Sequence, residues 1–299
     1  MKTRKPMLAT ALAAAFALVT MLAAPPQAGA APFRIVVGND DGYSAEGIAE
    51  LVRALTRNRS LEVYVFAPAT NQSGTGDRTT LGPLRIDPNV TTAFGYPATA
   101  VAGFPADGVL FGILQGLDQR PDLVISGINE GQNIAELVNI SGTVGAALWA
   151  ARNGVPAFAV SQGLAAEMHY EEAADYTARL VARYRSSPSF RKLMRISKDR
   201  ARVLNINFPT CVTGKLRGVR AVAVGRAQQI VGYEQGSSPN TWDPIVVTMP
   251  AGSTNCDSTL RHPTTDIEAM NNGFASVTPL NPDLTSDETI KPLVRLVEE

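Results

Sequence analysis

The sequence contains very little histidine or cysteine and carries no net charge. Two histidines in 299 residues exclude His-rich zinc sites and argue against dinuclear metal centres built from His and Asp. Two cysteines are too few for a disulfide-dense scaffold or a four-thiolate metal site. Lys+Arg and Asp+Glu both number 27, so the chain has no global basic field that would bind nucleic acid. The hydrophobic share of 45% is ordinary for a globular protein.

The first thirty residues have the pattern of an export signal. A basic start precedes the apolar run 7–24, which Pro25 and Pro26 end. Ala28-Gly29-Ala30 then fits the small-x-small pattern of a cleavage site. The apolar run is also about long enough to span a membrane, so an uncleaved anchor is the alternative. We expect cleavage after Ala30, because these features follow in the required order, and hence a periplasmic or secreted protein without a stable membrane span.

Export bears on the two cysteines, Cys211 and Cys256, because disulfides persist outside the cytoplasm. A bridge between them would close a loop of 45 residues. The chain-entropy model credits such a loop with about 4 kcal/mol of stabilisation. Two buried thiols are the alternative, and we favour the bridge.

Strand-like and helix-like segments alternate along the first two hundred residues. Short β-branched apolar runs alternate with segments whose apolar residues recur every three to four positions, as on one face of a helix. Strands are expected at 33–38, 61–67, 123–126 and 156–161, and helices around 48–55, 105–117, 143–153 and 173–184. This order predicts right-handed βαβ units and therefore an α/β, Rossmann-like three-layer sandwich with a mostly parallel sheet.

After about residue 200 the helical signal weakens and the loops become rich in Gly, Ser, Pro and Asn. Strands are expected at 203–208, 219–224, 245–249 and 274–278, and Thr285 with Glu288 resembles a capping box for a last helix. The predicted organisation is a signal peptide at 1–30, a Rossmann-like core at 31–200 and a strand-rich C-terminal extension at 201–299 that completes the core.

Three polar loops are expected at one edge of the sheet, because ligands of open α/β sheets bind at the carboxyl ends of the strands. They are 39–42, 71–76 and 126–133. The first contains the adjacent carboxylates Asp40 and Asp41, which in a partly desolvated crevice need a cation or an added proton. The nearby oxygen donors suit Mg, Mn or Ca rather than Zn or Cu. On this pair alone, a solvated turn is an equally good interpretation.

Ser141-Gly142-Thr143 precedes the helix expected from Val144. The triplet fits an ordinary N-cap. A helix start also offers free N–H groups and a positive dipole end, which bind phosphate. A cation beside such a helix start is the arrangement of a phosphate-ester hydrolase, in which the metal polarises the phosphoryl group or activates water.

Separate motifs in a fixed order carry a family resemblance. They are Ile35 to Ile48 around Asn39-Asp40-Asp41-Gly42, Ala67-Pro68, Gln72-Ser73-Gly74, Pro105-Ala106-Asp107, Pro121-Asp122-Leu123, Ser126-Gly127-Ile128-Asn129, Ser141-Gly142-Thr143-Val144, Leu204-Asn205-Ile206-Asn207 and Ser276-Val277-Thr278-Pro279-Leu280. In these motifs the sequence resembles the SurE (stationary-phase survival protein) family of metal-dependent nucleotidases and acid phosphatases, over nearly the whole mature chain.

The resemblance implies hydrolysis of nucleoside monophosphates with one Mg or Mn ion per subunit, and homodimers or homotetramers built through the C-terminal extension. The residues that match the family's metal ligands are Asp40, Asp41, Ser73 and Asn129. Those that match its phosphate-binding residues are Asn133, Ser141, Gly142 and Thr143. We expect Asp40 and Asp41 to be the catalytic residues. The motifs contain no His, so a water activated by the metal is a simpler nucleophile than an Asp side chain.

Three departures from the family pattern lie around the phosphate loop. They are Phe104 in place of a threonine, Ala135 in place of a glycine and Ile140 in place of a tyrosine. These changes bear on specificity more than on chemistry. Two alternatives stay open, an exported small-anion binding protein and an inactive structural relative. The second half lacks the βαβ pattern that a two-lobed binding protein needs, and the retained Asp40 and Asp41 argue against inactivity.

Overall fold

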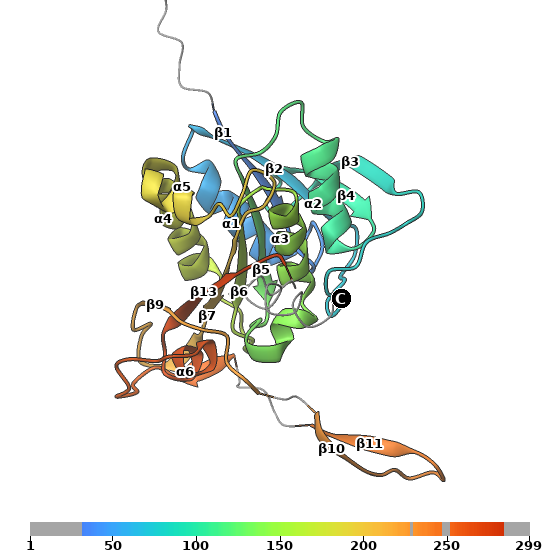
Figure 1. The fold of residues 1–299 in the computed structure, drawn as a ribbon, viewed down its shortest axis with the longest axis vertical. Coiled ribbons are helices and arrows are strands. Elements are labelled where there is room, and N and C mark those ends of the chain that lie inside the picture. Colours follow the sequence, from blue (N-terminus) through green and yellow to red (C-terminus); the bar gives the residue numbers. More distant parts are fainter. Residues whose placement is uncertain (1–31, 228–229, 247–251, 284–299) are drawn as a thin grey trace, which may run out of the picture. The chain divides into compact units, whose positions relative to one another are not determined.

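The computed structural model describes residues 32–227, 230–246 and 252–283 (Figure 1). The predicted signal peptide, the helix predicted from Thr285 and the end of the strand predicted at 245–249 lie outside these ranges. Within them, none of the helices combines the length and hydropathy that a membrane span requires.

A nine-stranded sheet holds most of the strands, in the order β3-β4-β2-β1-β5-β6-β7-β13-β9. The strands in chain order are β1 (Phe33–Gly38), β2 (Leu61–Pro68), β3 (Arg85–Thr91), β4 (Pro97–Ala102), β5 (Leu123–Glu130), β6 (Ala157–Gln162), β7 (Val203–Phe208), β9 (Val219–Ala221) and β13 (Ala275–Leu280). The pairs β3–β4 and β7–β13 are antiparallel, and the other pairs in this sheet are parallel. The predicted α/β architecture with a mostly parallel sheet is confirmed.

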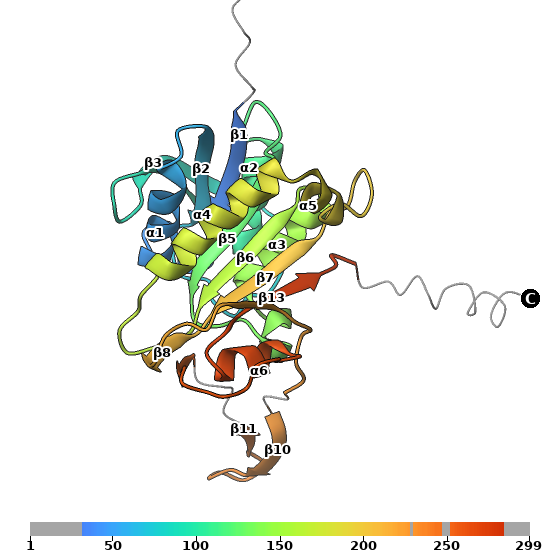
Figure 2. The ribbon, with the colours of Figure 1, turned by 90° about the vertical axis from the view of Figure 1, so that its left-hand side faces the viewer.

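Helices cover both faces of the sheet (Figure 2). Helices α1 (Glu46–Thr56) and α4 (Glu171–Ser186) pack on one face, and α2 (Pro105–Leu114) and α3 (Gly142–Arg152) pack on the other. Successive β1 side chains therefore enter opposite cores: Ile35 and Val37 pack with α1 and α4, and Val36 packs with α2 and α3. Full burial of each such side chain stabilises the fold by about 1.5–3 kcal/mol, which explains why these three successive positions of the strand are all apolar.

Two features of the sheet differ from the sequence prediction. Strands β3 and β4 were not predicted, because β3 is an exposed edge strand with Pro88 and an irregular register, so it lacks the alternation of a half-buried strand. Strand β5 continues to Glu130 rather than ending near Ser126, so much of the predicted third loop is strand. The extension forms because Ile128 is buried and Asn129 pairs with Ser161 of β6.

The predicted C-terminal extension supplies strands to the main sheet as well as smaller elements. Strands β7, β13 and β9 continue the sheet in that order beyond β6. The smaller elements of the extension are β8 (Thr210–Thr213) paired with β12 (Ser253–Asn255), β10 (Ile230–Gln235) paired with β11 (Trp242–Val246), and α6 (Asp266–Asn271). Two further short elements, η1 (Ala135–Asn139) and α5 (Pro188–Leu193), belong to the predicted core.

Cys211 on β8 and Cys256, just after β12, form a disulfide. Cys211 lies opposite Thr254 in the β8–β12 pairing, and Cys256 is buried. The predicted pairing is confirmed, and it ties together two segments that are 45 residues apart.

Reduction of this disulfide should destabilise the protein, because the unfolded chain regains the freedom of the closed loop. We expect the free energy of unfolding to fall by up to about 4 kcal/mol, measured by urea denaturation with and without a thiol reductant. The double variant Cys211→Ser/Cys256→Ser is the control, because its unfolding midpoint should not respond to reductant. An unchanged midpoint for the reduced wild type would contradict a stabilising bridge.

Candidate functional site

The strand order reverses at β1. The chain runs from β1 to β2 and β4 on one side, and later returns to β5, β6 and β7 on the other. In open α/β sheets, a crevice lies at the carboxyl ends of the strands where the order reverses. Asp40 and Asp41 directly follow β1, and Asn129 lies at the end of β5. The topology therefore brings these polar residues to one crevice.

The turn after β1 is held by Asn39, as its position predicts. The Asn39 Nδ2 group donates to the Gly42 carbonyl at 2.8 Å, and the Gly42 N–H donates to Asn39 Oδ1 at 3.2 Å. Gly42 has a φ of 109°, a left-handed value that glycine adopts at little cost. This closed turn fixes the backbone of Asp40 and Asp41 between its two ends.

Asp40 is 2% exposed and contacts the start of α3. The Thr143 hydroxyl donates to Asp40 Oδ1 at 2.5 Å, although the two residues are 103 positions apart in sequence. A Cβ atom on Gly142 would lie 2.8 Å from Asp40 Cβ, so a side chain there would force the helix start away. The acidic pair and the Ser-Gly-Thr triplet therefore meet directly.

Ser141 caps α3, since its Oγ accepts from the Val144 N–H at 3.1 Å. The ordinary capping interpretation of this residue is thus correct. Capping leaves the other two members of the triplet, Gly142 and Thr143, facing Asp40. Within the triplet, the Ser141 hydroxyl therefore caps the helix, and the Thr143 hydroxyl contacts Asp40.

Asp41 is half-buried and is held from two sides. Its Oδ2 accepts from the Glu130 N–H at 3.0 Å, and its Oδ1 accepts from Asn71 Nδ2 at 3.4 Å. Burial, together with the negative charge of Asp40, raises the pKa of Asp41 to about 7. Burial also raises the pKa of Asp40. Ionising both carboxylates therefore costs free energy unless a cation lies beside them.

The side-chain oxygen of Asn129 is a candidate metal ligand. Its Nδ2 donates to the Gly131 carbonyl at 2.6 Å, whereas its Oδ1 is buried without a hydrogen-bond partner in the described part of the chain. An orphaned amide oxygen at the strand end next to two carboxylates fits a hard divalent cation. The described residues contain no group of three or more His, Cys, Asp or Glu that could hold a metal, so amide and hydroxyl oxygens would complete such a site.

Ser73 lies exposed in the loop that follows β2. Its N–H donates to Asn71 Oδ1 at 2.9 Å, and Asn71 in turn contacts Asp41. The preceding Gln72 N–H donates to the Asp40 carbonyl at 2.7 Å. This loop is therefore attached to the acidic turn by a side-chain and a backbone contact of the two residues just before Ser73.

Asn133 is buried between α3 and the sheet. Its Nδ2 donates to Ser161 Oγ at 2.9 Å and to Thr143 Oγ1 at 3.3 Å. Its backbone N–H donates to Asn207 Oδ1 at 2.7 Å, while its carbonyl accepts from Asn205 Nδ2 at 2.8 Å and Asn207 Nδ2 at 3.2 Å. Two β7 side chains thus hold the Asn133 backbone much as a neighbouring strand would. The family resemblance included these two residues, but no sequence pattern indicated this contact.

Ala135 has a φ of 50°, in the left-handed region that favours glycine. This backbone conformation explains why a glycine is usual there in the resembled family. The Ala135 N–H donates to Asp266 Oδ2 at 3.1 Å, and the fully buried Asp266 also accepts from the Gly225 N–H at 2.7 Å. Asp266 therefore helps to hold the loop after Asn133, which the sequence did not reveal.

Comparisons with known proteins assign the chain to a family. Residues 35–230 match the family described as "Survival protein SurE". The chain belongs to the SurE family. Proteins named 5'-nucleotidase SurE from Erythrobacter litoralis and Desulforamulus reducens are each 36% identical to it, over 84% of this chain and 94% of the relative. A crystal structure of SurE protein from Aquifex aeolicus matches with a TM-score of 0.69 and 29% identity, over 88% of this chain and 99% of that chain.

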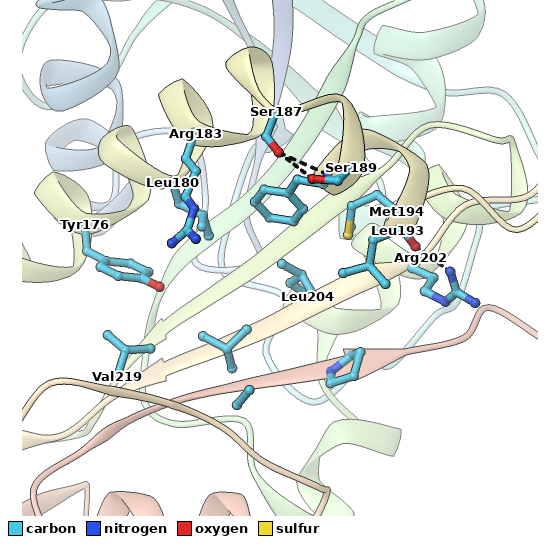
Figure 3. A pocket seen from close by; sticks show the side chains of 14 residues that line it. Tyr176, Leu180, Arg183, Ser187, Ser189, Leu193, Met194, Arg202, Leu204 and Val219 are labelled. Carbon is cyan, nitrogen blue, oxygen red and sulfur yellow. Dashed lines mark hydrogen bonds between the residues drawn. The ribbon is translucent and has the colours of Figure 1, made fainter.

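A large cavity elsewhere in this SurE-family chain contains none of the predicted site residues. It has a volume of about 790 Å³ and lies between α4, α5 and strands β7, β9 and β13 (Figure 3). Its walls are mainly apolar, with Tyr176, Leu180 and Leu204 among the lining side chains. Cavity size therefore does not locate the polar crevice, and the strand order does.

Replacement of Asn207 by leucine should destabilise the SurE-family fold by about 1–3 kcal/mol, because the Asn133 N–H is left buried without an acceptor. Urea unfolding measures the change. Ser276 lies opposite Asn207 in the β7–β13 pairing, and its buried hydroxyl has no partner among the described residues, so Ser276→Ala is the matched control. Equal stability of the Asn207→Leu variant and wild type would show that the Asn133 contact contributes nothing.

Proposed function

We propose that this chain is a metal-dependent phosphomonoesterase that hydrolyses nucleoside monophosphates to nucleoside and phosphate. The observation that carries the proposal is the contact between Asp40 and Thr143. It brings carboxylates suited to bind a cation next to a helix start suited to bind an anion. The relatives named 5'-nucleotidase SurE support the nucleotide substrate.

We propose that one divalent ion per subunit is held by Asp40, Asp41, Ser73 and Asn129. The ion is Mg or Mn, and Ca also suits these ligands. The raised pKa values of both carboxylates and the orphaned Asn129 Oδ1 support this set. All four donors are hard oxygen atoms, which favours these ions over Zn. When bound, the ion would supply Lewis-acid polarisation of the phosphoryl group and activation of water.

The phosphate itself is assigned to Asn133, Ser141, Gly142 and Thr143. The free N–H groups and positive dipole end of α3 attract an anion. Because Gly142 has no side chain, the start of this helix can lie directly against Asp40. The Asn133 amide is oriented by Ser161 and Thr143. Donors that are already in place stabilise negative charge in the transition state without reorganisation.

Asp40→Asn should lose most of the activity, at least about a hundredfold, because a neutral amide holds a divalent ion far less tightly than a carboxylate. Phosphate release from a panel of monoesters, with added Mn²⁺ and with a chelator, measures this loss. Asp87→Asn, on the exposed edge strand β3, is the control and should retain wild-type turnover.

Two results would contradict the proposal. One is full activity in the presence of chelator or in the Asp40→Asn variant. The other is the absence of phosphate release from every monoester by the Mn²⁺-loaded wild type, which would favour an anion-binding protein or an inactive relative. Trapping of a phosphoenzyme on Asp40 would overturn water as the nucleophile.

We further propose that residues 1–30 are a signal peptide and that the enzyme acts in the periplasm or outside the cell. The Cys211–Cys256 disulfide supports an oxidising compartment. An enzyme there would recover phosphate from external nucleotides and other monoesters. Expression of the full chain should yield periplasmic protein that begins at Ala31, as measured by fractionation and N-terminal sequencing. Retention of Met1 on membrane-bound protein would instead favour the uncleaved anchor.

We also propose that the chain forms homodimers or homotetramers through its C-terminal extension, 201–299. Large apolar side chains are exposed on the β10–β11 pair, which supports burial against another subunit. They are Ile230, Val231, Tyr233, Trp242 and Ile245.

A further inference from the structure

A second cavity, of about 440 Å³, lies at the same edge of the sheet as the acidic turn. Strands β1, β2 and β4 are parallel neighbours, so their carboxyl ends lie together. The cavity is lined by the end of β4 and the two residues after it, and by four residues of the loop between β2 and β3. The lining residues are Ala69, Thr70, Gln72, Thr80, Val101, Ala102, Gly103 and Phe104. Its volume falls within the usual range for small-molecule sites.

Two walls of this cavity are joined to the crevice described above. Gln72 lines the cavity, and its backbone N–H donates to the Asp40 carbonyl at 2.7 Å. Phe104 is followed by Pro105, whose Cγ lies 3.0 Å from the position of a Cβ on Gly142. The cavity is therefore adjacent to both the acidic turn and the start of α3.

The wall that contains Phe104 is held firmly by Asp107, which is buried. Asp107 Oδ2 accepts from the Phe104 N–H at 2.8 Å and from the Thr80 hydroxyl at 2.7 Å. The Thr80 N–H donates to Asp107 Oδ1 at 3.0 Å. A single carboxylate thus fixes the position of two lining residues that are far apart in sequence.

Phe104 also carries a cation on its ring. The Arg78 guanidinium lies 4.5 Å from the ring centroid, and the neighbouring Asp77 pairs with Arg152 instead. Arg78 is exposed, so its planar guanidinium is accessible at this ring. An aromatic ring and a guanidinium both stack on flat π systems. Hydroxyl and amide groups of Thr70, Gln72 and Thr80 in the lining can bond to polar ring edges or a sugar.

We propose that this cavity is the subsite for the leaving group, and that Phe104 with Arg78 selects a flat aromatic group, a nucleobase, over a small alkyl group. The inference rests on the proposed function and adds its specificity determinant. Phe104 stands where the resembled family usually has threonine, so the stacking surface belongs to this chain rather than to the shared chemistry.

The test compares adenosine 5'-monophosphate with glycerol phosphate as substrates of wild type and Phe104→Thr. For the nucleotide, we expect kcat/KM to fall by about tenfold, mainly through KM, as for loss of one base–aromatic stack. For glycerol phosphate, which has no ring, kcat/KM should stay within about twofold. Phe104→Tyr keeps a π face and should retain nucleotide activity. Phe94→Ala removes an exposed aromatic ring from the β3–β4 turn and should change neither substrate.

Adenosine provides a measurement that does not depend on turnover of the nucleotide. It should bind the Mn²⁺-loaded wild type in calorimetry and inhibit glycerol phosphate hydrolysis, and both effects should weaken about tenfold in Phe104→Thr. An unaltered melting temperature for this variant would separate lost stacking from lost folding. Equal losses for the two substrates, or no loss for the nucleotide, would overturn the subsite. If the wild type hydrolyses neither substrate, that result would instead overturn the proposed function.

Discussion

The burial of two adjacent carboxylates at the end of β1 is the constraint on which the site depends. Asp40 and Asp41 lie where water cannot fully solvate them, and both have raised pKa values. The Thr143 hydroxyl and the Glu130 N–H offset part of that cost. The cost of ionisation that remains favours the binding of a cation beside the pair. The start of α3 and the end of β5 are positioned around this unfavourable pair, and the fold supplies the stability that keeps it buried.

The opposite side of the crevice depends on the C-terminal extension. Asn205 and Asn207 come from β7, beyond the predicted core, yet they bond to the backbone of Asn133. Asp266 from α6 holds the next turn of the same loop through Ala135. The extension thus supports the loop that contains Asn133 and Ala135, in addition to supplying strands to the sheet.

The groups proposed to carry out the chemistry and the groups proposed to select the substrate lie in separate parts of the same sheet edge. The groups proposed to hold metal and phosphate follow β1 and β5 and begin α3, whereas the aromatic wall follows β4. Asp107 fixes that wall without contributing to the acidic turn. Such a division allows Phe104 to differ from the family pattern while the acidic pair and the Ser-Gly-Thr triplet are kept. Under the proposed assignment, this one loop position sets the range of accepted leaving groups.

The sequence alone determined the sheet class, the helical faces, the acidic turn and the cysteine pairing, because each has a local signature in periodicity or residue chemistry. That the acidic turn and the Ser-Gly-Thr triplet lie together was also predicted, whereas the hydrogen bond from Thr143 to Asp40 came from the tertiary structure. The tertiary structure decided the edge strand β3 and its neighbour β4, the left-handed backbone of Ala135 and the bond from Asn133 to Asn207. It also brought Phe104 and Arg78 together. These features depend on exposure or on partners distant in sequence, so no local pattern encodes them.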